Sequence, residues 1–592
     1  MAEERDPSPV VFLLGAGASV DAGCPTVVNL VEGFQRFVEK DDPKCAAALS
    51  AIVELMRESP AVRDHRLLVD VELLLATIRA LSDRENNLLS PFVRHWRQAV
   101  SECAPSLSQL DKLLQRFIRQ QCTVNPKRVK YLWPIVDFVG LYQKLDIFTL
   151  NYDASIEIVC QQKEIPYTDG FDLYWNPAQF DSPRNKLRLF KLHGSLLWYA
   201  TSGAPRQLVK IPIRATGAHE IKFFTDEEVS DILIYPALSK EQHVEPYATL
   251  MAEFREALSK ASVVVAIGCS FRDQYIKQII LERMLLNPEL QLVVVDPDAA
   301  AMLVRSDTTL SADWTFGAIK HRVSLLESST RGAFSGHELL RRVRNLSELP
   351  VLRTAYESSI LSGESRESQV DHARRYLSSL IETQHVGAMT RVLQDAGSGP
   401  YWQAIRLELT RAEFDIIESA PRLFPVMILI LAFSRSLTLR REARAWLEGH
   451  ARWLSQYAVC RVGSGYKSLM AGQQNPQIGD ADAFFAEHAL RLDESISELE
   501  RWAGQMEFAL PKDVSDDVYH LLADLQLLYD YFYGAQGSEA RFKSEDGKRV
   551  LPMSKDQDVM TKLGERYDSD GLPLSLLRLL KHAQPRPPRR RS

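Results

Sequence analysis

Short apolar runs, nearly continuous and rich in β-branched residues, recur through the first half of the chain and alternate with stretches of helical periodicity. They occupy residues 10–14, 145–149, 187–192, 232–235, 263–267 and 290–295, and residues 322–325 could form one more edge strand. Uninterrupted apolar runs of this length are typical of strands buried on both faces. Because they alternate with helical segments, the sequence predicts an α/β fold built on a parallel sheet.

The segments between and after these runs set the domain organisation, since 592 residues exceed what one hydrophobic core usually holds. We predict a first domain over 1–345 with a helical insertion at 27–143, a Ser/Glu-rich linker over 346–369, an all-α domain over 370–580 and a basic, disordered tail over 581–592. Amphipathic periodicity in the all-α domain predicts helices at about 370–395, 401–419, 423–458, 481–507 and 514–534.

Composition excludes several classes of protein. The net charge of −6 argues against a broad nucleic-acid-binding surface. No two of the 7 cysteines have the spacing of a zinc knuckle, so we expect neither a structural zinc ribbon nor another metal. The longest apolar stretch, 424–433, is about half of the roughly 20 residues that a membrane helix needs, and the N-terminus lacks the pattern of a signal peptide. We therefore expect a cytoplasmic protein that does not contact membranes.

A glycine-rich turn follows the first apolar run, with the order Gly15, Ala16, Gly17, Ala18, Ser19. Glycines at this position let the backbone turn tightly and approach a phosphate, while the N-terminus of the next helix supplies amide donors. The pattern is neither a complete G-x-G-x-x-G fingerprint nor a Walker A loop. An ordinary turn is the alternative.

Polar residues also follow the next two apolar runs. Thr149, Asn151 and Asp153 alternate after the second run, and His193 precedes a glycine after the third. At the carboxyl ends of parallel strands, such side chains point into the ligand crevice. A histidine there could transfer protons near neutral pH. The alternatives are that Asn151 and Asp153 cap the following helix and that His193 is a structural residue.

Two further strand ends carry weaker signals. Gly268 and Ser270 follow the run at 263–267, and Asp296 and Asp298 follow the run at 290–295, where a carboxylate could hold a ribose hydroxyl or an adenine edge. Polar motifs at five strand ends of one sheet together indicate a dinucleotide crevice.

Two acidic residues lie in the apolar helical stretch 67–81. We interpret Asp70 and Glu72 as a solvated or salt-bridged pair, with a position facing the crevice as the alternative.

In their order along the chain, the motifs resemble those of the SIR2 (sirtuin) family over roughly residues 8–300. The resemblance rests on Gly15-Ala-Gly-Ala-Ser19, Thr149-x-Asn-x-Asp153, His193-Gly194 and Gly268-x-Ser270. It implies a Rossmann-like parallel sheet of the sirtuin type, with a helical insertion, followed by an all-α C-terminal domain. It also implies that the bound nucleotide is NAD. The form of the stretch 268–273 is more similar to SIR2-like domains of bacterial anti-phage defence proteins than to protein deacylases.

Departures from the deacylase pattern point to a different reaction. The zinc cysteines are missing, Pro25 is followed by Thr26-Val-Val rather than Asp-Phe-Arg, and Leu150 stands where deacylases have glutamine. The resemblance therefore implies an NAD⁺ glycohydrolase that takes NAD as substrate. An NAD-dependent protein deacylase and a non-catalytic module that senses NAD or ADP-ribose are the alternatives.

The resemblance also implies residue roles and partners. Asn151 would hold the nicotinamide ribose or the attacking water, and His193 would act as general base. The remaining cofactor-binding positions are Gly15, Ala16, Gly17 and Ser19 at the pyrophosphate, Asp153 at the nicotinamide amide, Ser270 and Asp298 or Asp296 toward the adenosine, and Thr149 and Gly268 beside them. We expect a homo-oligomer whose helical domain senses a phage-derived trigger or binds an operon-encoded partner protein.

Overall fold

The computed structural model describes most of both halves of the chain, as two compact units. The described residues are 9–59, 62, 69–82, 96–182, 184–201, 208–211, 229–233, 245–299, 319, 322–383, 385–395, 403–404, 420–455, 481–533, 565–568 and 572–582. The first unit comprises residues 1–319 and 323–347, and the second comprises 320–322 and 348–592.

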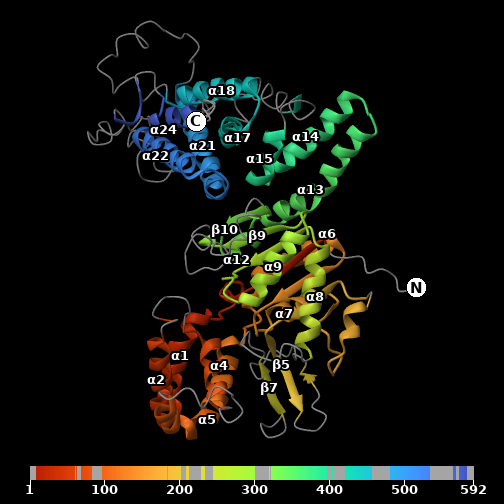
Figure 1. Ribbon diagram of the computed structural model, residues 1–592, viewed down its shortest axis with the longest axis vertical. Coiled ribbons are helices and arrows are strands. Elements are labelled where there is room, and N and C mark those ends of the chain that lie inside the picture. Colours follow the sequence, from red (N-terminus) through yellow and green to blue (C-terminus); the bar gives the residue numbers. More distant parts are fainter. Residues whose placement is uncertain are drawn as a thin grey trace, which may run out of the picture. The chain divides into compact units, whose positions relative to one another are not determined.

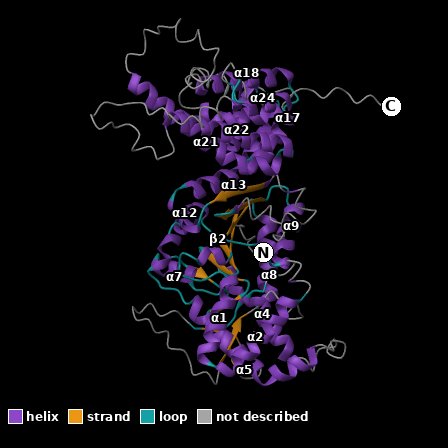
Figure 2. Ribbon diagram, turned by 90° about the vertical axis from the view of Figure 1, so that its left-hand side faces the viewer, coloured by secondary structure: helices purple, strands orange, loops and turns teal. Residues whose placement is uncertain are grey.

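A parallel sheet forms the core of the first unit (Figure 2). Its spatial order is β10-β9-β8-β1-β2-β4-β3. The strands are β1 (Val10–Leu14), β2 (Leu145–Thr149), β3 (Tyr167–Thr168), β4 (Leu187–Lys191), β8 (Val263–Ile267), β9 (Gln291–Asp296) and β10 (Val323–Glu327). The chain moves outward from β1 through β2 and β4, then returns to β8 on the other side of β1. This reversal is the topological switch point, where open α/β sheets bind their ligands.

Helices cover both faces of the sheet, which explains the uninterrupted apolar runs. On one face, Phe12 of β1 contacts Phe138 of α6 (Ile135–Tyr142), with ring centroids 5.0 Å apart. On the other face, Phe148 of β2 contacts Phe254 of α8 (Tyr247–Lys260) at 4.8 Å. Further helices that flank the sheet are α7 (Ser155–Gln162), α9 (Gln274–Leu286) and α12 (Thr330–Ser335). The predicted α/β sheet is confirmed.

The described part of the predicted insertion is helical. It forms α1 (Val27–Asp41), α2 (Pro43–Glu58), α4 (Val71–Ser82), α5 (Trp96–Cys122) and the 3₁₀ turn η4 (Arg128–Leu132) before α6 (Figure 1). Asp42 begins α2 as its N-cap and accepts hydrogen bonds from the amides of Lys44 and Cys45. Phe34 of α1 packs on Phe117 of α5 with centroids 5.5 Å apart, so these helices share an apolar core.

A small antiparallel sheet follows β4 and corrects one predicted strand. Its order is β6-β5-β7, with β5 (Gly194–Thr201), β6 (Leu208–Lys210) and β7 (Val229–Leu233). The run at 232–235 was expected in the parallel sheet, but its described residues belong to β7 and pair with β5. Residues 234–235 lie outside the described part. A short apolar run fits either kind of strand, so its partner could not be inferred from composition.

The predicted linker at 346–369 is helical for most of its length. It contains much of α13 (Glu338–Leu361) and the start of α14 (Arg366–Glu382). Gly363, with φ +67°, follows α13, and the Ser365 hydroxyl caps α14 by accepting from the Ser368 amide. Residues that indicated a linker are therefore caps between two helices.

The second unit is all-α in its described residues, as predicted. After α14 it contains α15 (Val386–Asp395), α17 (Ala420–Phe433), α18 (Leu437–Ser455), α21 (Ala481–Ala509), α22 (Lys512–Tyr533) and α24 (Leu574–His582). The predicted helix at 423–458 is two helices, because Ser434 and Ser436 turn the chain between α17 and α18. Most of the predicted helix at 401–419, and the tail beyond residue 582, lie outside the described residues. No helix among the described residues combines the length and apolarity needed to cross a membrane.

Candidate functional site

Two glycine turns pack backbone against backbone at the switch point. Gly15 follows β1 and Gly268 follows the neighbouring β8. The Gly15 amide donates to the Ile267 carbonyl at 2.9 Å, and the Gly17 amide donates to the Gly268 carbonyl at 3.1 Å. A Cβ on Gly15 would lie 2.4 Å from the Gly268 oxygen. Packing between the two loops therefore requires glycine here, whether or not a phosphate binds to the loop.

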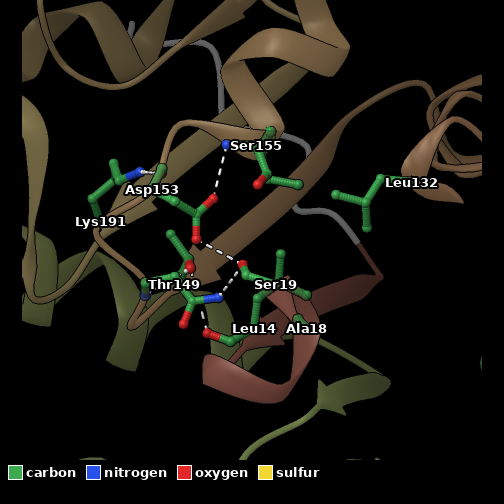
Figure 3. Close-up of a pocket in the computed structure, with 10 residues that line it drawn as sticks. Leu14, Ala18, Ser19, Leu132, Thr149, Asp153, Ser155 and Lys191 are labelled. Atoms are coloured by element: carbon green, nitrogen blue, oxygen red, sulfur yellow. Dashed lines mark hydrogen bonds between the residues drawn. The ribbon is translucent and has the colours of Figure 1, made fainter. Parts of the chain in front are cut away.

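A hydrogen-bonded group joins the first turn to the end of β2. The Ser19 hydroxyl donates to Asp153 Oδ2 at 2.6 Å (Figure 3). The Asn151 amide donates to the Gly15 carbonyl at 2.8 Å and to Ser19 Oγ at 2.9 Å. The Thr149 hydroxyl accepts from the Asn151 backbone amide at 3.0 Å. The structure thus brings together the residues that the sequence predicted on two separate strand ends.

Neither Asn151 nor Asp153 is the N-cap of α7, which is Ala154. Asp153 Oδ1 accepts from the Ser155 amide at 2.9 Å at the start of α7, while Oδ2 faces Ser19. Asp153 therefore serves the helix and the site together. Asn151 directs its side chain to the glycine turn instead of to α7.

These residues line a small pocket beside the turn (Figure 3). Its wall consists of Leu14, Ala18, Ser19, Leu132, Thr149, Asn151, Asp153, Ser155, Ile156 and Lys191. The buried Ser155 hydroxyl has no hydrogen-bond partner among the described residues. A buried hydroxyl without a partner is costly, so this wall favours a polar ligand group.

Lys191 is a charged wall residue that sequence reasoning missed. It ends β4 and is 1% exposed; its ammonium donates to the Asp153 backbone carbonyl and lies 3.2 Å from Glu157 Oε1. Glu157 is fully buried on α7, and burial raises the pKa of its carboxyl although the Lys191 charge opposes this. The sequence did offer one signal, a lysine at the end of an apolar strand run. A buried charge without a partner would destabilise the fold there, so a lysine at that position indicates an ion pair.

His193 follows β4 and lies between two carboxylates. Its Nε2 is 3.0 Å from Asp273 Oδ2, and its Nδ1 is 3.4 Å from Glu72 Oε1. The side chain is only 2% exposed. Burial by itself would lower the pKa of this imidazole, but the hydrogen bond to Asp273 and the contact with Glu72 outweigh burial and raise the pKa to about 9. His193 is therefore charged at neutral pH in this arrangement.

The two carboxylates come from elements far apart in the sequence. Asp273 caps α9, with Oδ1 accepting from the amides of Tyr275 and Ile276. Glu72 lies in the first turn of α4, in the helical insertion. Its carboxylate lies at ion-pair distance from His193, as expected for a salt-bridged residue. Asp70 caps the same helix by accepting from the Leu73 amide at 2.8 Å, and burial raises its pKa to about 6.

The raised pKa of His193 makes a prediction about stability. A histidine whose pKa is higher in the folded protein stabilises it fully below the unfolded value of 6.5, and this contribution is lost as pH rises through about 9. We expect the first unit to lose about 3 kcal/mol of unfolding free energy over this range, by an order-of-magnitude conversion. Chemical denaturation at pH 6.5 and 9.5 measures the difference.

Two variants isolate the histidine's contribution. His193→Gln should remove this part of the pH dependence, whereas His337→Gln, at an exposed position, should retain it. If His193→Gln and the parent lose stability in parallel between these two pH values, the histidine is not held in its charged form.

The remaining predicted positions lie at the same sheet edge but are exposed. Ser270 follows β8, and Asp298 follows β9, where its amide donates to Asp296 Oδ1 at 2.9 Å. Asn151 and His193 each lie two residues beyond the paired Thr149 and Lys191 of β2 and β4. The edge from β9 to β2 covers three strand spacings, or roughly 14 Å. The candidate positions are therefore spread along the edge.

A doubly wound parallel sheet with polar strand ends gathered at its switch point defines a class of α/β proteins that bind ligands in that crevice. Residues 146–312 match the family model of the SIR2-like domain. The chain therefore contains a SIR2-like domain, as its motifs predicted.

Several solved structures are similar to this chain at low sequence identity. A Sir2 homologue mutant in complex with ADP-ribose matches with 13% identity over 57% of this chain and 93% of that chain, at a TM-score of 0.28. A complex of mutant Sir2 homologues with 2′-O-acetyl ADP-ribose gives the same values. A complex of a Sir2 homologue with NAD matches with 13% identity over 58% of this chain and 91% of that chain, at a TM-score of 0.26. A comparison with curated proteins finds no match.

Proposed function

We propose that the protein is an NAD⁺ glycohydrolase, which cleaves the bond between nicotinamide and ribose and releases nicotinamide and ADP-ribose. The observation that carries this proposal is the convergence of Asn151, Ser19 and Asp153 on one pocket at the switch point of a SIR2-like domain. The unpartnered Ser155 hydroxyl in the wall of that pocket offers a polar contact to a ligand.

The spread of the site along the sheet edge suits an elongated ligand. The pocket lies beside β1 and β2, while the exposed Ser270 and Asp298 follow β8 and β9. A dinucleotide could place its nicotinamide half beside the pocket and its adenosine half toward β9. The glycine turn between them would hold the pyrophosphate with Gly15, Ala16, Gly17 and Ser19.

Cleavage of this bond develops positive charge on the ribose carbon C1′. Stabilisation must then come from fixed dipoles and positioned groups around the ribose. The Asn151 amide, already oriented by two hydrogen bonds, would orient the ribose or the attacking water. His193 would accept the proton of that water once one of its two ring nitrogens has lost its own proton.

Product analysis of NAD incubated with the full-length protein tests the proposal. We expect nicotinamide and ADP-ribose in equal amounts, without an acylated peptide in the reaction. Release of O-acyl-ADP-ribose only when an acyl-peptide is present would instead indicate a deacylase. NAD that binds stoichiometrically and is recovered intact would indicate a sensing module.

We further propose that the activity is a regulated effector of anti-phage defence in the cytoplasm, because unrestrained NAD hydrolysis would deplete the host cell. The helical unit at 348–592 would sense a phage-derived trigger or bind a partner protein, and the chain would form a homo-oligomer. Cellular NAD should fall after infection in cells that express the parent protein. An equal fall in uninfected cells would contradict regulation.

A further inference from the structure

The contacts of His193 connect the helical insertion to the candidate site. One ring nitrogen faces Asp273, on the loop after β8, and the other faces Glu72, on α4. The three side chains are largely withdrawn from solvent, with exposures of 2% for His193, 8% for Asp273 and 22% for Glu72. Two carboxylates from distant parts of the chain therefore bracket one buried imidazole, with a hydrogen bond at Nε2 and an ion-pair contact without a hydrogen bond at Nδ1.

Such a bracket determines which form of the imidazole fits. A neutral imidazole has one N–H and one lone pair, so one nitrogen would direct its lone pair at a carboxylate oxygen. The charged form carries an N–H on both nitrogens and can donate to both carboxylates. The pKa of about 9 agrees with this arrangement. An imidazole that already carries both protons cannot serve as a base.

The two carboxylates are held with different firmness. Asp273 is fixed by its second oxygen, which caps α9 through two backbone amides at 2.9 and 3.1 Å. Glu72 is the more exposed of the two, and its further contact is a long hydrogen bond of 3.5 Å from the Tyr152 hydroxyl. Glu72 is therefore the partner that can withdraw from His193.

Other ionisable groups surround this bracket and belong to its electrostatics. Asp70 interacts unfavourably with Glu72 and favourably with Arg272, and the charge of Asp273 helps raise the pKa of Tyr247 above its usual value. These groups, with Tyr152, are common to the parent and to each variant below. The comparison between variants therefore isolates Glu72 and Asp273.

We propose that Asp273 and Glu72 are positioning residues for His193: Asp273 orients the imidazole, and Glu72 holds its second proton until that carboxylate moves away from Nδ1. This proposal rests on the proposed NAD hydrolysis. When Glu72 withdraws, the Nδ1 proton leaves to solvent while Nε2–H remains donated to Asp273. The Nδ1 lone pair can then take a proton from the attacking water as its oxygen bonds C1′ and the bond electrons leave with nicotinamide.

The protonation of His193 is measured directly by NMR of the full-length protein labelled with isotopic histidine, with His193→Gln identifying its signal. We expect a titration midpoint near pH 9 in the parent. Glu72→Gln should lower it by at least about one pH unit, because it removes a charge while keeping the side-chain shape. Glu72→Ala should move the midpoint in the same direction. Glu54→Gln, at an exposed position on α2, is the matched control and should leave it unchanged.

The pH profile of kcat/KM for NAD cleavage supplies the second measurement. Glu72→Gln should move the acidic limb of this pH profile to lower pH. The shift should equal the shift in the His193 titration midpoint. Asp273→Asn should lower kcat across the profile, because an amide that donates to Nε2 imposes the opposite tautomer. If Glu72 had a purely structural role, Glu72→Gln would reduce kcat/KM without shifting the acidic limb of the pH profile.

The outcomes separate this proposal from the function on which it rests. If Glu72→Gln leaves the His193 midpoint unchanged while the parent cleaves NAD, the bracket proposal is overturned and the hydrolase stands. If the midpoint shifts as expected but neither parent nor variants consume NAD, the bracket is real and the proposed hydrolysis fails.

Discussion

Asn151→Ala is expected to abolish NAD turnover, with a loss of at least about a hundredfold in kcat. The Asn151 amide donates both of its N–H groups, to the Gly15 carbonyl and the Ser19 hydroxyl, so it would meet the ligand as an acceptor through Oδ1. Alanine removes the group that would meet the ribose or the attacking water, and it also releases Ser19 from one of its contacts. The rate of nicotinamide release, measured for the purified parent and variant under activating conditions, gives the ratio of their kcat values.

The control for this prediction is another asparagine in the same unit. Asn125 is exposed and accepts a hydrogen bond from the Lys127 amide, so Asn125→Ala should retain turnover. His193→Ala should show a loss comparable to that of Asn151→Ala. If both site variants fold and deplete NAD as fast as the parent, these residues are not the reaction centre.

Gly268→Ala is expected to be the most damaging single-methyl change for the fold of the first unit. Gly268 has φ +60°, a conformation that alanine adopts with strain. Its added Cβ would lie 2.4 Å from the Ala18 nitrogen and the Gly17 carbonyl carbon, both backbone atoms that cannot rotate away. We expect a loss of about 3 kcal/mol or more in unfolding free energy. Thermal unfolding with a local tryptophan probe measures it.

Gly140→Ala is the matched control, because Gly140 lies inside α6 and an added Cβ would meet nothing within 4 Å. In a helix interior, alanine is favoured over glycine by about 0.5–1 kcal/mol. The two identical substitutions should therefore move stability in opposite directions. A Gly268→Ala protein as stable as the parent would show that the two glycine turns can separate freely.

The sheet was predictable because its strands carry a local signature. Burial on both faces demands apolar residues at consecutive positions, and the runs at 10–14, 145–149 and 263–267 coincide with β1, β2 and β8. Pairing is not local, so the run at 232–235 gave no indication that its residues join an antiparallel partner. The helices within the predicted linker were missed for a related reason: Gly363 and Ser365 end and begin helices, and turn-forming residues look alike in either setting.

The candidate site was predictable where its residues follow strands. The sequence identified Asn151, Asp153 and Ser19 because each follows a parallel strand. Residues at that position lie at the ligand crevice of such a sheet. Glu72 lies on α4 and Asp273 is the N-cap of α9, and their approach to His193 depends on how distant helices pack. No spacing in the sequence encodes that approach. Lys191 was noticeable in the sequence as a charged residue at the end of an apolar run. The reason for its position, an ion pair with the buried Glu157, is visible only in the structure.

The pairing of the first strand with one far along the chain governs when the protein could become active during its own synthesis. Val10 pairs with Val263, so β1 leaves the ribosome long before its neighbour exists. Contacts of such wide sequence separation form late, and domains of this size commonly pass through incomplete states. The Gly268 turn and Asp273 are translated after β8, so a nascent or prematurely ended chain lacks half of the turn packing and one side of the histidine bracket. The proposed NAD hydrolysis would therefore begin only after β8 and the loop that follows it have been made.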